Sequence, residues 1–532
     1  MSRSSRSGAT TLRLLAAAAL AAPALLSAVA VAPAARALIG TCTVPEVPRP
    51  FDLTGDLLND WAVGEPGRGA DEGAVHVVSR VGTVFHDLRL VQGAPVLPGG
   101  ATVPGTSEAG DRFGAATAIG DFDGDGCGDL AIGAPGENGG RGSVTILFGN
   151  ASVPNRVFGE SSFSGATARP GEQFGAVLLT AELDGDARTD LVIGAFGERV
   201  TSTGTEQGGF AVVTGAQLAA RTATFPQPVV SAASAGVPGT PENGDRFGRA
   251  LATGDFDGDG DDDLAVGVPG ENAGRGAVVV LSNPGGGIRA PFTARAFDQD
   301  SPGVPGTAEP GDLFGAALAA GDVGFPGVFT EDLAVGAPGE NASAGSVTFV
   351  PGTAAGPTGA GSTVVTQATR GVAGAPAPGD RFGAALLVAA FDEKSSRNSV
   401  VIGAPGDVVS GHAGAGSVTF LEESATGPTP LPDLTIVGTF TQDSARVPGT
   451  AEAGDGFGST LSGHGGATDW SLLIGVPGED LGGVAGAGAV NWFDGSDGGG
   501  ASPLGTTLVE ADTPGIVGVR DTGGRFGAAL DG

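Results

Sequence analysis

The sequence predicts an all-β fold, a seven-bladed β-propeller closed by pairing of its N- and C-terminal half-repeats. A Phe-Gly pair recurs seven times, at Phe113, Phe174, Phe247, Phe314, Phe382, Phe457 and Phe526. Each of the first six is followed by a Gly-Ala-Pro-like element, beginning at Gly133, Gly194, Gly267, Gly336, Gly403 and Gly475. The seventh pair has no such element after it, and an unmatched one, Gly64-Glu65-Pro66, stands near the start of the chain.

The incomplete repeats at the two ends complement each other. A closed ring explains them, because the last strand then pairs beside the first and leaves only short, protected sheet edges. A linear stack of repeats gains nothing from split ends. The Phe-Gly spacings lie between 61 and 75 residues, so we expect no inserted domain.

Each repeat is expected to form one blade of four short antiparallel strands. In one repeat the expected elements are a turn-rich lead-in at 103–112, strands at 113–120, 130–133, 142–147 and near 156–158, a loop at 121–129 and a turn at 136–140. Pro135 ends the second strand because proline cannot donate to a ladder. We expect each repeated Phe to fill the wedge between blades, where its burial contributes roughly 1.5–3 kcal/mol. The following Gly allows close backbone approach.

Composition favours a turn-rich β-protein over a disordered chain. Gly supplies 98 residues and Pro 36, but hydrophobic residues make up 40% and recur in register with the glycines. The formal net charge is −32, and it becomes −36 without residues 1–37, which hold four Arg and no acid. Such a surface repels nucleic acid and anionic lipid, and it suits bound cations.

Residues 1–37 are typical of a signal peptide, which leaves residues 38–532 as the propeller. Arg3, Arg6 and Arg13 precede an apolar run at 14–31, and Ala35-Arg36-Ala37 has the pattern of a cleavage site. A membrane helix and a lipid anchor on Cys42 are the alternatives. We therefore expect a secreted or extracellular protein, with cell-surface association left open.

The chain has two cysteines, Cys42 and Cys127. An exported protein can oxidise such a pair, and the resulting disulfide would tie down the N-terminal segment. Two free thiols are the alternative, and the sequence does not decide between them.

The loop at 121–129 carries the clearest chemistry. Asp121, Asp123, Asp125 and Asp129 occupy its positions 1, 3, 5 and 9, and Cys127 at position 7 would offer its backbone carbonyl. Four acids this close repel one another unless a cation sits among them, and glycines at positions 4 and 6 let the loop curl around it. Hard oxygen ligands suit Ca²⁺, which accepts about 6–8 of them, and Mg²⁺ is the second choice.

The pattern recurs in other repeats. The complete copies are Asp255, Asp257, Asp259 and Asp263 with Asp261 at position 7, and Glu182, Asp184, Asp186 and Asp190 with Arg188 at position 7. The N-terminal half-repeat gives a weaker copy, Asp52, Thr54, Asp56 and Asp60, in which a hydroxyl replaces one carboxylate. The loops at 322–332, 392–394 and 464–469 have lost it. We expect three good Ca²⁺ sites, one weaker site and none in the remaining three repeats.

These loops have two alternative interpretations. An EF-hand begins in the same way but needs an acid at position 12, where this chain has Ile132 and Val266. A metal-free acidic turn is the other alternative.

The order Phe-Gly, Asp-x-Asp-x-Asp-Gly-x-x-Asp, Gly-Ala-Pro resembles the FG-GAP repeat of integrin α-subunit head domains and of many secreted bacterial proteins. The resemblance covers residues 51–532. It implies a seven-bladed propeller with Ca²⁺ held in hairpin loops on one face, and it carries the ligand roles onto the acids named above. Integrin α-chains continue into stalk domains, a membrane span and a cytoplasmic tail, so we expect the propeller alone here and carry over no integrin signalling.

Three functions compete. The first is an integrin-like adhesion or ligand-binding module that contacts a protein or glycan through the face opposite the metal loops. The second is a secreted hydrolase or phospholipase-like enzyme, and the third is a structural cell-surface scaffold. Fold does not choose among them. We expect a monomer without a transmembrane span and without nucleic-acid partners.

No catalytic motif was found. The four histidines are His76, His86, His412 and His464, and none has metal-ligand spacing. His86-Asp87 is the only adjacent acid–base pair among them, and we interpret it as a solvated loop pair. The sequence thus favours a binding protein over an enzyme.

Overall fold

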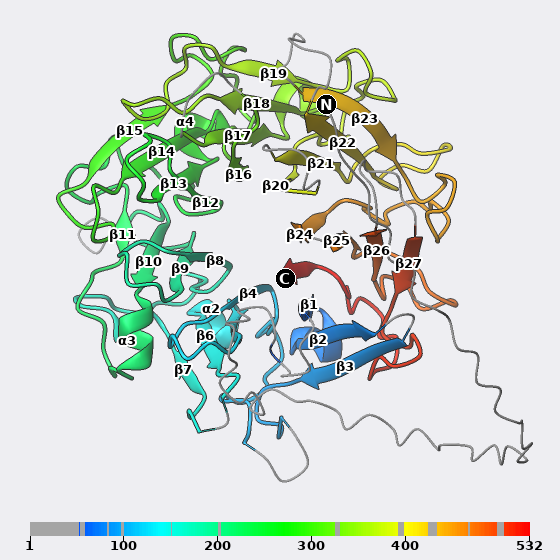
Figure 1. Cartoon of the computed structure of the whole chain (residues 1–532), viewed down its shortest axis with the longest axis horizontal. Coiled ribbons are helices and arrows are strands. Elements are labelled where there is room, and N and C mark those ends of the chain that lie inside the picture. The colour runs from blue at the N-terminus through cyan, green and yellow to red at the C-terminus, as the bar shows by residue number, and fades with distance from the viewer. Residues whose placement is uncertain are drawn as a thin grey trace, which may run out of the picture. The chain divides into compact units, whose positions relative to one another are not determined.

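Short runs of small and β-branched residues form the strands, and Gly and Pro end them. In the computed structural model these strands make seven four-stranded antiparallel sheets arranged as blades around a ring (Figure 1). The structure describes residues 53, 59–81, 84–96, 101–150, 152–199, 204–324, 330–391, 398–423, 434–465, 469–496 and 505–531, which all lie in one unit, Ala37–Gly532. The predicted seven-bladed β-propeller is confirmed.

The blades are numbered in chain order, each from its innermost strand outward. Blade 1 contains β28 (Ala529–Asp531), β1 (Trp61–Glu65), β2 (Ala74–Val81) and β3 (Val84–Leu90). Blade 2 contains β4 (Ala116–Gly120), β5 (Asp129–Ala134), β6 (Ser143–Leu147) and β7 (Arg156–Phe158). Blade 3 contains β8 (Val177–Ala181), β9 (Asp190–Ala195), β10 (Gly209–Val213) and β11 (Val230–Ser231). Blade 4 contains β12 (Leu251–Gly254), β13 (Asp263–Val268), β14 (Ala277–Ser282) and β15 (Thr293–Phe297).

The remaining three blades follow the same order. Blade 5 contains β16 (Ala317–Gly321), β17 (Asp332–Ala337), β18 (Ser346–Val350) and β19 (Thr363–Val365). Blade 6 contains β20 (Ala385–Ala389), β21 (Ser399–Ala404), β22 (Ser417–Glu423) and β23 (Leu434–Phe440). Blade 7 contains β24 (Thr460–Gly465), β25 (Asp469–Val476), β26 (Ala489–Ser496) and β27 (Gly505–Val509).

The ring is closed by strands from the two ends of the chain. β28 pairs antiparallel with β1, with Val63 opposite Leu530 and Gly64 opposite Ala529. The innermost strands contact one another around the whole ring, and β28 lies between β24 and β4. The predicted complementarity of the two half-repeats is therefore confirmed.

The Phe-Gly pairs lie just before the first strands rather than within them. In blade 2 the strand begins at Ala116, because Arg112 (φ 54°) and Gly114 (φ 87°) turn the chain sharply. This turn lets the Phe174 backbone N–H, at the same place in blade 3, donate to the Arg141 carbonyl oxygen of the preceding blade at 3.2 Å. All seven Phe side chains are at most 1% exposed, so the predicted wedge role is confirmed.

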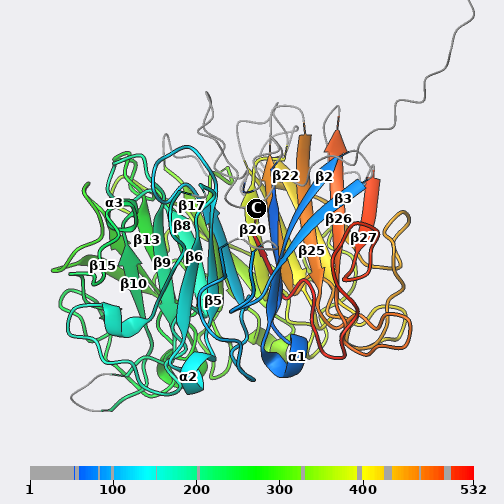
Figure 2. The same ribbon diagram turned by 90° about the horizontal axis from the view of Figure 1, so that it is seen from below.

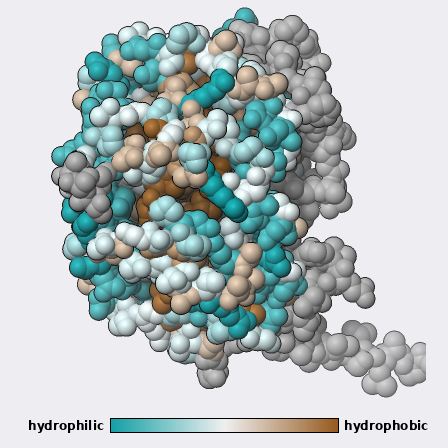
Figure 3. All heavy atoms as spheres, turned by 90° about the vertical axis from the view of Figure 1, so that its left-hand side faces the viewer, coloured by the Kyte–Doolittle hydropathy of each residue, from teal (hydrophilic) through white to brown (hydrophobic). Residues whose placement is uncertain are grey.

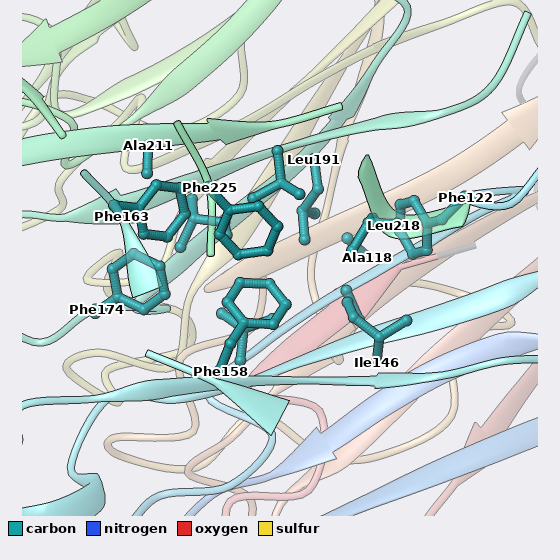
Figure 4. Packing of buried hydrophobic residues seen from close by; sticks show 14 of the residues in the cluster. Ala118, Phe122, Ile146, Phe158, Phe163, Phe174, Leu191, Ala211, Leu218 and Phe225 are labelled. Carbon is teal, nitrogen blue, oxygen red and sulfur yellow. The ribbon is translucent and has the colours of Figure 1, made fainter. Parts of the chain in front are cut away.

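The packing between blades 2 and 3 shows how the wedge is filled (Figure 4). Phe174 lies among Phe158, Phe163 and Phe225, and the ring centroids of Phe163 and Phe225 are 4.8 Å apart. Leu191 and Ile146 extend the cluster along the facing sheets. Each blade thus buries its faces only against its neighbours, which couples the blades energetically.

The two faces of the ring carry different connections. The acidic loops join the first and second strands on one face, here the aspartate-loop face, where α3 (Gly215–Ala219) also lies. The Gly-Ala-Pro-like turns join the second and third strands on the opposite face, here the turn face. Short helical turns follow them: α1 (Arg68–Asp71), α2 (Glu137–Gly140), α4 (Glu271–Gly274) and α5 (Glu340–Ser343). Figure 2 shows α3 at the top edge and α1 and α2 at the bottom.

A cavity of about 140 Å³ lies where blades 3 and 4 meet, beside β11, which is only two residues long. Its lining includes Phe247, Val279, Phe297 and Glu271. Figure 3, which views this side of the ring, shows apolar side chains in a hollow surrounded by polar ones.

No helix among the described residues is both long enough and apolar enough to cross a bilayer.

Candidate metal centres

The loop between β4 and β5 curls around the carboxylate of Asp121. Its Oδ1 accepts the backbone N–H of Gly124 at 2.8 Å, and its Oδ2 accepts that of Gly126 at 2.8 Å. Gly124 and Gly126 have φ values of 75° and 86°, a region that glycine adopts without strain. The predicted role of the glycines at positions 4 and 6 is therefore visible in the backbone.

In each of the three complete loops the structure brings three acids together. Oxygen atoms lie within 4.8 Å of one another in the groups Asp121, Asp123 and Asp129; Glu182, Asp184 and Asp190; and Asp255, Asp257 and Asp259. One predicted carboxylate in each loop, Asp125, Asp186 or Asp263, stands outside these groups. All three loops belong to consecutive blades and lie on the aspartate-loop face.

The acid at position 9 has a structural role that the sequence did not reveal. Asp129 accepts the Phe122 N–H and the Gly149 N–H, both at 2.9 Å, and so joins the loop to the end of β6. Asp332 accepts the Val323 and Gly352 N–H groups in the same way, in a repeat that has lost the inner acids. The acid just before the second strand therefore bonds the backbone of its loop, in addition to any part in holding an ion.

Electrostatics in the first loop favour a bound cation. Burial, together with the charges of Asp125 and Asp121, raises the pKa of Asp123 to about 6. Burial also raises the pKa of Asp129 well above its usual value, against the two backbone bonds that lower it. A divalent ion would reverse these penalties because it neutralises the crowded carboxylates.

The Glu182 loop differs because an arginine enters it. Arg188 Nη1 bonds Asp186 Oδ2 at 2.9 Å, and Arg188 Nε donates to the Asp123 carbonyl oxygen of the neighbouring loop at 3.4 Å. Because Asp186 is paired with this guanidinium, three acids of the loop remain to hold an ion, Glu182, Asp184 and Asp190. Asp184 Oδ1 is buried without a hydrogen-bond partner, so an oxygen ligand is still available.

The Asp255 loop repeats the curl of the first loop in a more exposed setting. Asp255 accepts the N–H groups of Gly258 at 2.6 Å and Gly260 at 3.0 Å. Asp263 is fully buried, and its Oδ2 has no partner, although its Oδ1 accepts the Asn283 N–H at 2.8 Å. The Asp261 N–H donates to Asp259 Oδ1 at 3.0 Å, and its place as a carbonyl ligand stays a prediction.

The weaker predicted site is only partly visible. Asp52, Thr54 and Asp56 lie outside the described residues, while Asp60 is buried and accepts the Leu53 N–H at 2.7 Å. Residues 392–394 and the side chains of 464–469 lie outside what the structure describes, and the described residues of the loop at 322–332 form no group of three converging acids.

Cys127 is fully buried and disulfide-bonded. The predicted partner, Cys42, lies outside the described residues, so this pairing stays a prediction.

The interpretation of His86-Asp87 as a solvated loop pair is wrong. Both residues belong to β3, where successive side chains point to opposite faces. Asp87 is buried and its Oδ2 lies 2.9 Å from Nδ1 of His76, which in turn lies 3.4 Å from Glu65 Oε2 through Nε2. The sequence could have indicated this buried pair only through the alternation of inward and outward side chains along β2 and β3, which pair with each other. Adjacency of His86 and Asp87 in the chain was misleading.

A fourth acidic group was not predicted. Glu160, Glu172 and Glu198 converge on the turn face between blades 2 and 3. They are far apart in sequence and follow no local motif, and only a comparison of equivalent positions between repeats reveals them.

Two segments of the chain, 113–147 and 247–281, match the family model of the FG-GAP repeat. Each contains a Phe-Gly pair, a complete acidic loop and a Gly-Ala-Pro-like element. The predicted presence of FG-GAP repeats is confirmed.

The chain is also similar to parts of known proteins. It is 33% identical over 239 residues to human integrin alpha-IIb, and 34% identical over 227 residues to Drosophila melanogaster integrin alpha-PS2. It is 34% identical over 157 residues to bovine phosphatidylinositol-glycan-specific phospholipase D. The matches cover 43%, 41% and 27% of this chain but only 20%, 14% and 17% of those proteins. The chain thus spans a fifth or less of the length of these relatives.

Proposed function

We propose that this chain is an extracellular, Ca²⁺-binding β-propeller that acts as an adhesion or ligand-binding module for a protein or glycan. The observation that carries the proposal is the convergence of three acids in each of three consecutive loops on one face. Similarity to integrin α-chains supports the same class of module.

The residues in these loops fit Ca²⁺. The first loop would hold it through Asp121, Asp123 and Asp129, with Asp125 and the Cys127 carbonyl as further candidates. The second would use Glu182, Asp184 and Asp190, and the third Asp255, Asp257 and Asp259. Flexible oxygen ligands with glycine-bent backbones accommodate Ca²⁺ more readily than the strict octahedron of Mg²⁺.

The ion would serve the fold rather than chemistry. Each loop ties the first strand of its blade to the second, and Asp129 and Asp190 extend this link to the end of the third strand. Fixing these loops stiffens the blades, and the turn face is then presented to a ligand as a rigid surface. A binding surface carried on a rigid scaffold loses less conformational entropy when a ligand binds.

The calcium sites can be tested with matched aspartates. At a free Ca²⁺ concentration about 100-fold above its dissociation constant, each occupied site stabilises the fold by about 2.7 kcal/mol. Asp257→Ala is expected to remove one bound ion and that Ca²⁺-dependent stabilisation. Ca²⁺ equilibrium dialysis and thermal denaturation, with and without EDTA, measure both.

Asp322→Ala is the control for this experiment. Asp322 and Asp257 each accept one loop N–H, from Gly324 at 3.0 Å and from Asp259 at 3.2 Å. Asp322 belongs to no group of three converging acids among the described residues of its loop. The assignment of Asp257 is wrong if both variants bind the full number of ions. It is also wrong if EDTA lowers the thermal stability of both variants by the same amount.

The binding role predicts a ligand that depends on Ca²⁺. On arrays of glycans and of purified extracellular proteins, the wild-type chain is expected to give signals that EDTA removes and that Asp257→Ala weakens. Asp322→Ala should leave them unchanged. Ca²⁺-dependent stability without any Ca²⁺-dependent signal would favour the structural scaffold, and hydrolysis of an array ester or phosphodiester would favour an enzyme.

A further inference from the structure

Three buried glutamates meet between blades 2 and 3, on the face opposite the aspartate loops. Glu160 begins the 3₁₀ turn Glu160–Ser162 after β7, Glu172 lies two residues before Phe174, and Glu198 lies in the turn after β9. Carboxylate oxygens of the three lie within 4.8 Å of one another. They come from both blades, so the group bridges the interface that Phe174 fills.

Other blades show what normally stands at this place. Two residues after the outer strand, blades 1, 4, 5 and 6 carry Gln92, Gln299, Gln367 and Gln442, where blade 2 carries Glu160. In three of these blades the glutamine donates to a glutamate of the next blade: Gln92 Nε2 to Glu137 Oε2 at 2.9 Å, and likewise Gln299 to Glu340 and Gln442 to Glu479. Blade 2 therefore replaces an amide that donates to the neighbouring glutamate with a third carboxylate, which cannot do so when ionised.

The replacement leaves oxygen atoms without partners. Glu160 is only 1% exposed, and neither Oε1 nor Oε2 has a hydrogen-bond partner. Glu172 Oε1 and Glu198 Oε2 are buried without partners as well. Arg169 is the nearby cation, with Nη1 3.6 Å from Glu172 Oε1, but one guanidinium faces three acids. Unpaired buried carboxylates are costly, and the site sets one positive charge against three acids.

We propose that these three glutamates bind a divalent cation that prefers oxygen ligands, with Ca²⁺ as the probe, in place of the glutamine amide of the other blades. The cation bridges blade 2 to blade 3 from the turn face and neutralises the carboxylates that lack donors. Glu198 is partly exposed, which gives the ion a route in and leaves room for water ligands. This site goes beyond the aspartate loops, because it uses other residues on the other face.

A shared proton is the competing explanation. Burial, the charges of Glu198 and Glu172 and, in the protonated form, carboxyl–carboxylate hydrogen bonds to both of them raise the pKa of Glu160 to about 9. A protonated Glu160 would donate a hydrogen bond as the glutamine does, with no metal needed. The two explanations differ in how many ions the chain binds.

Glu160→Gln separates them, because it recreates the arrangement of blades 1, 4 and 6. The full chain, dialysed against Ca²⁺ at pH 7.5, is expected to bind one ion fewer per chain than wild type. In EDTA the variant is expected to be at least as stable as wild type, since the amide supplies the missing donor. Equal ion counts for the two proteins would overturn the proposal in favour of the shared proton.

Two further variants keep the result interpretable. Glu198→Gln should lose the same ion, so the test survives if one variant fails to fold. Asp257→Ala should lose an ion at the aspartate loop, and combining it with Glu160→Gln should lose two, because distant sites add. Loss at Glu160 with none at Asp257 would overturn the proposed function alone, and loss at Asp257 with none at Glu160 or Glu198 would overturn this inference alone.

Discussion

Replacing His76 with alanine is expected to lower the free energy of unfolding by about 3–5 kcal/mol, the cost of breaking a buried ion pair by removing one partner. His76 is fully buried between Asp87 and Glu65, which are 5% and 1% exposed. Without the imidazole these two acids would remain buried in the blade that closes the ring. Asp87 Oδ2 also accepts the Val517 N–H at 2.7 Å. A shift of Asp87 in the variant would therefore also weaken the attachment of the C-terminal segment that leads to β28.

His86→Ala is the control, because His86 lies on the neighbouring strand and is partly exposed. Its cost should stay within about 0.5 kcal/mol. Denaturant unfolding of both variants and of wild type gives the comparison, and equal costs for the two histidines would contradict the buried pair.

The pH dependence of stability checks the charge of His76. Burial lowers its pKa, but the charge and hydrogen bond of Asp87, together with those of Glu65, outweigh burial and raise it to about 9 from 6.5. Because the folded pKa is the higher, the stabilisation is fully present below about pH 6.5 and is lost as the pH rises through about 9. Wild type should lose stability over this window relative to His76→Ala, and parallel pH profiles would show that the folded histidine is neutral.

Gly142→Ala is expected to destabilise the protein by roughly 2–5 kcal/mol, the sum of backbone strain and overpacking. Gly142 forms a parallel bridge with Phe174 of the next blade and has a φ of 82°. A Cβ there would lie 2.1 Å from the Phe174 carbonyl oxygen and 2.5 Å from its nitrogen. Backbone atoms cannot move aside as a flexible side chain can, so the two blades would have to separate.

Gly139→Ala supplies the matched control in the same turn. Gly139 has a φ of 74°, but a Cβ there would meet no heavy atom within 4 Å. It should therefore cost only the strain, about 1–2 kcal/mol. The difference between the two variants measures contact between blades, and equal thermal stability of both would show that this contact contributes nothing.

The repeating features of the fold could be predicted from the sequence because the same motifs recur in every repeat. The Phe-Gly pairs, the Gly-Ala-Pro-like turns and the split ends predicted seven blades and their closure, and the pairing of Val63 with Leu530 confirms both. The place of the Phe-Gly pair was less accessible, since Phe113 reads as a strand residue. Only the positive φ values at Arg112 and Gly114 show that the chain turns there.

The aspartate loops were predictable because their acids and glycines are close in sequence. Their finer chemistry was not, because it depends on neighbours in space. Arg188 reaches both Asp186 and the adjacent loop, and Asp129 bonds the end of β6. His76 and Asp87 are 11 residues apart and meet only through the pairing of β2 with β3. The Glu160 group depends on the packing of two blades, which no local pattern encodes.

The pairing of β28 with β1 sets the order in which the protein can mature. The chain is synthesised from its N-terminus, so β1 is made early. One edge of β1 stays unpaired until residues 529–531 have been made. Until then the nascent protein exposes an unsatisfied strand of apolar residues, the kind of edge that recruits other chains. The edge of Trp61–Glu65 therefore stays unpaired for longer during synthesis than the edges closed by pairing within one repeat.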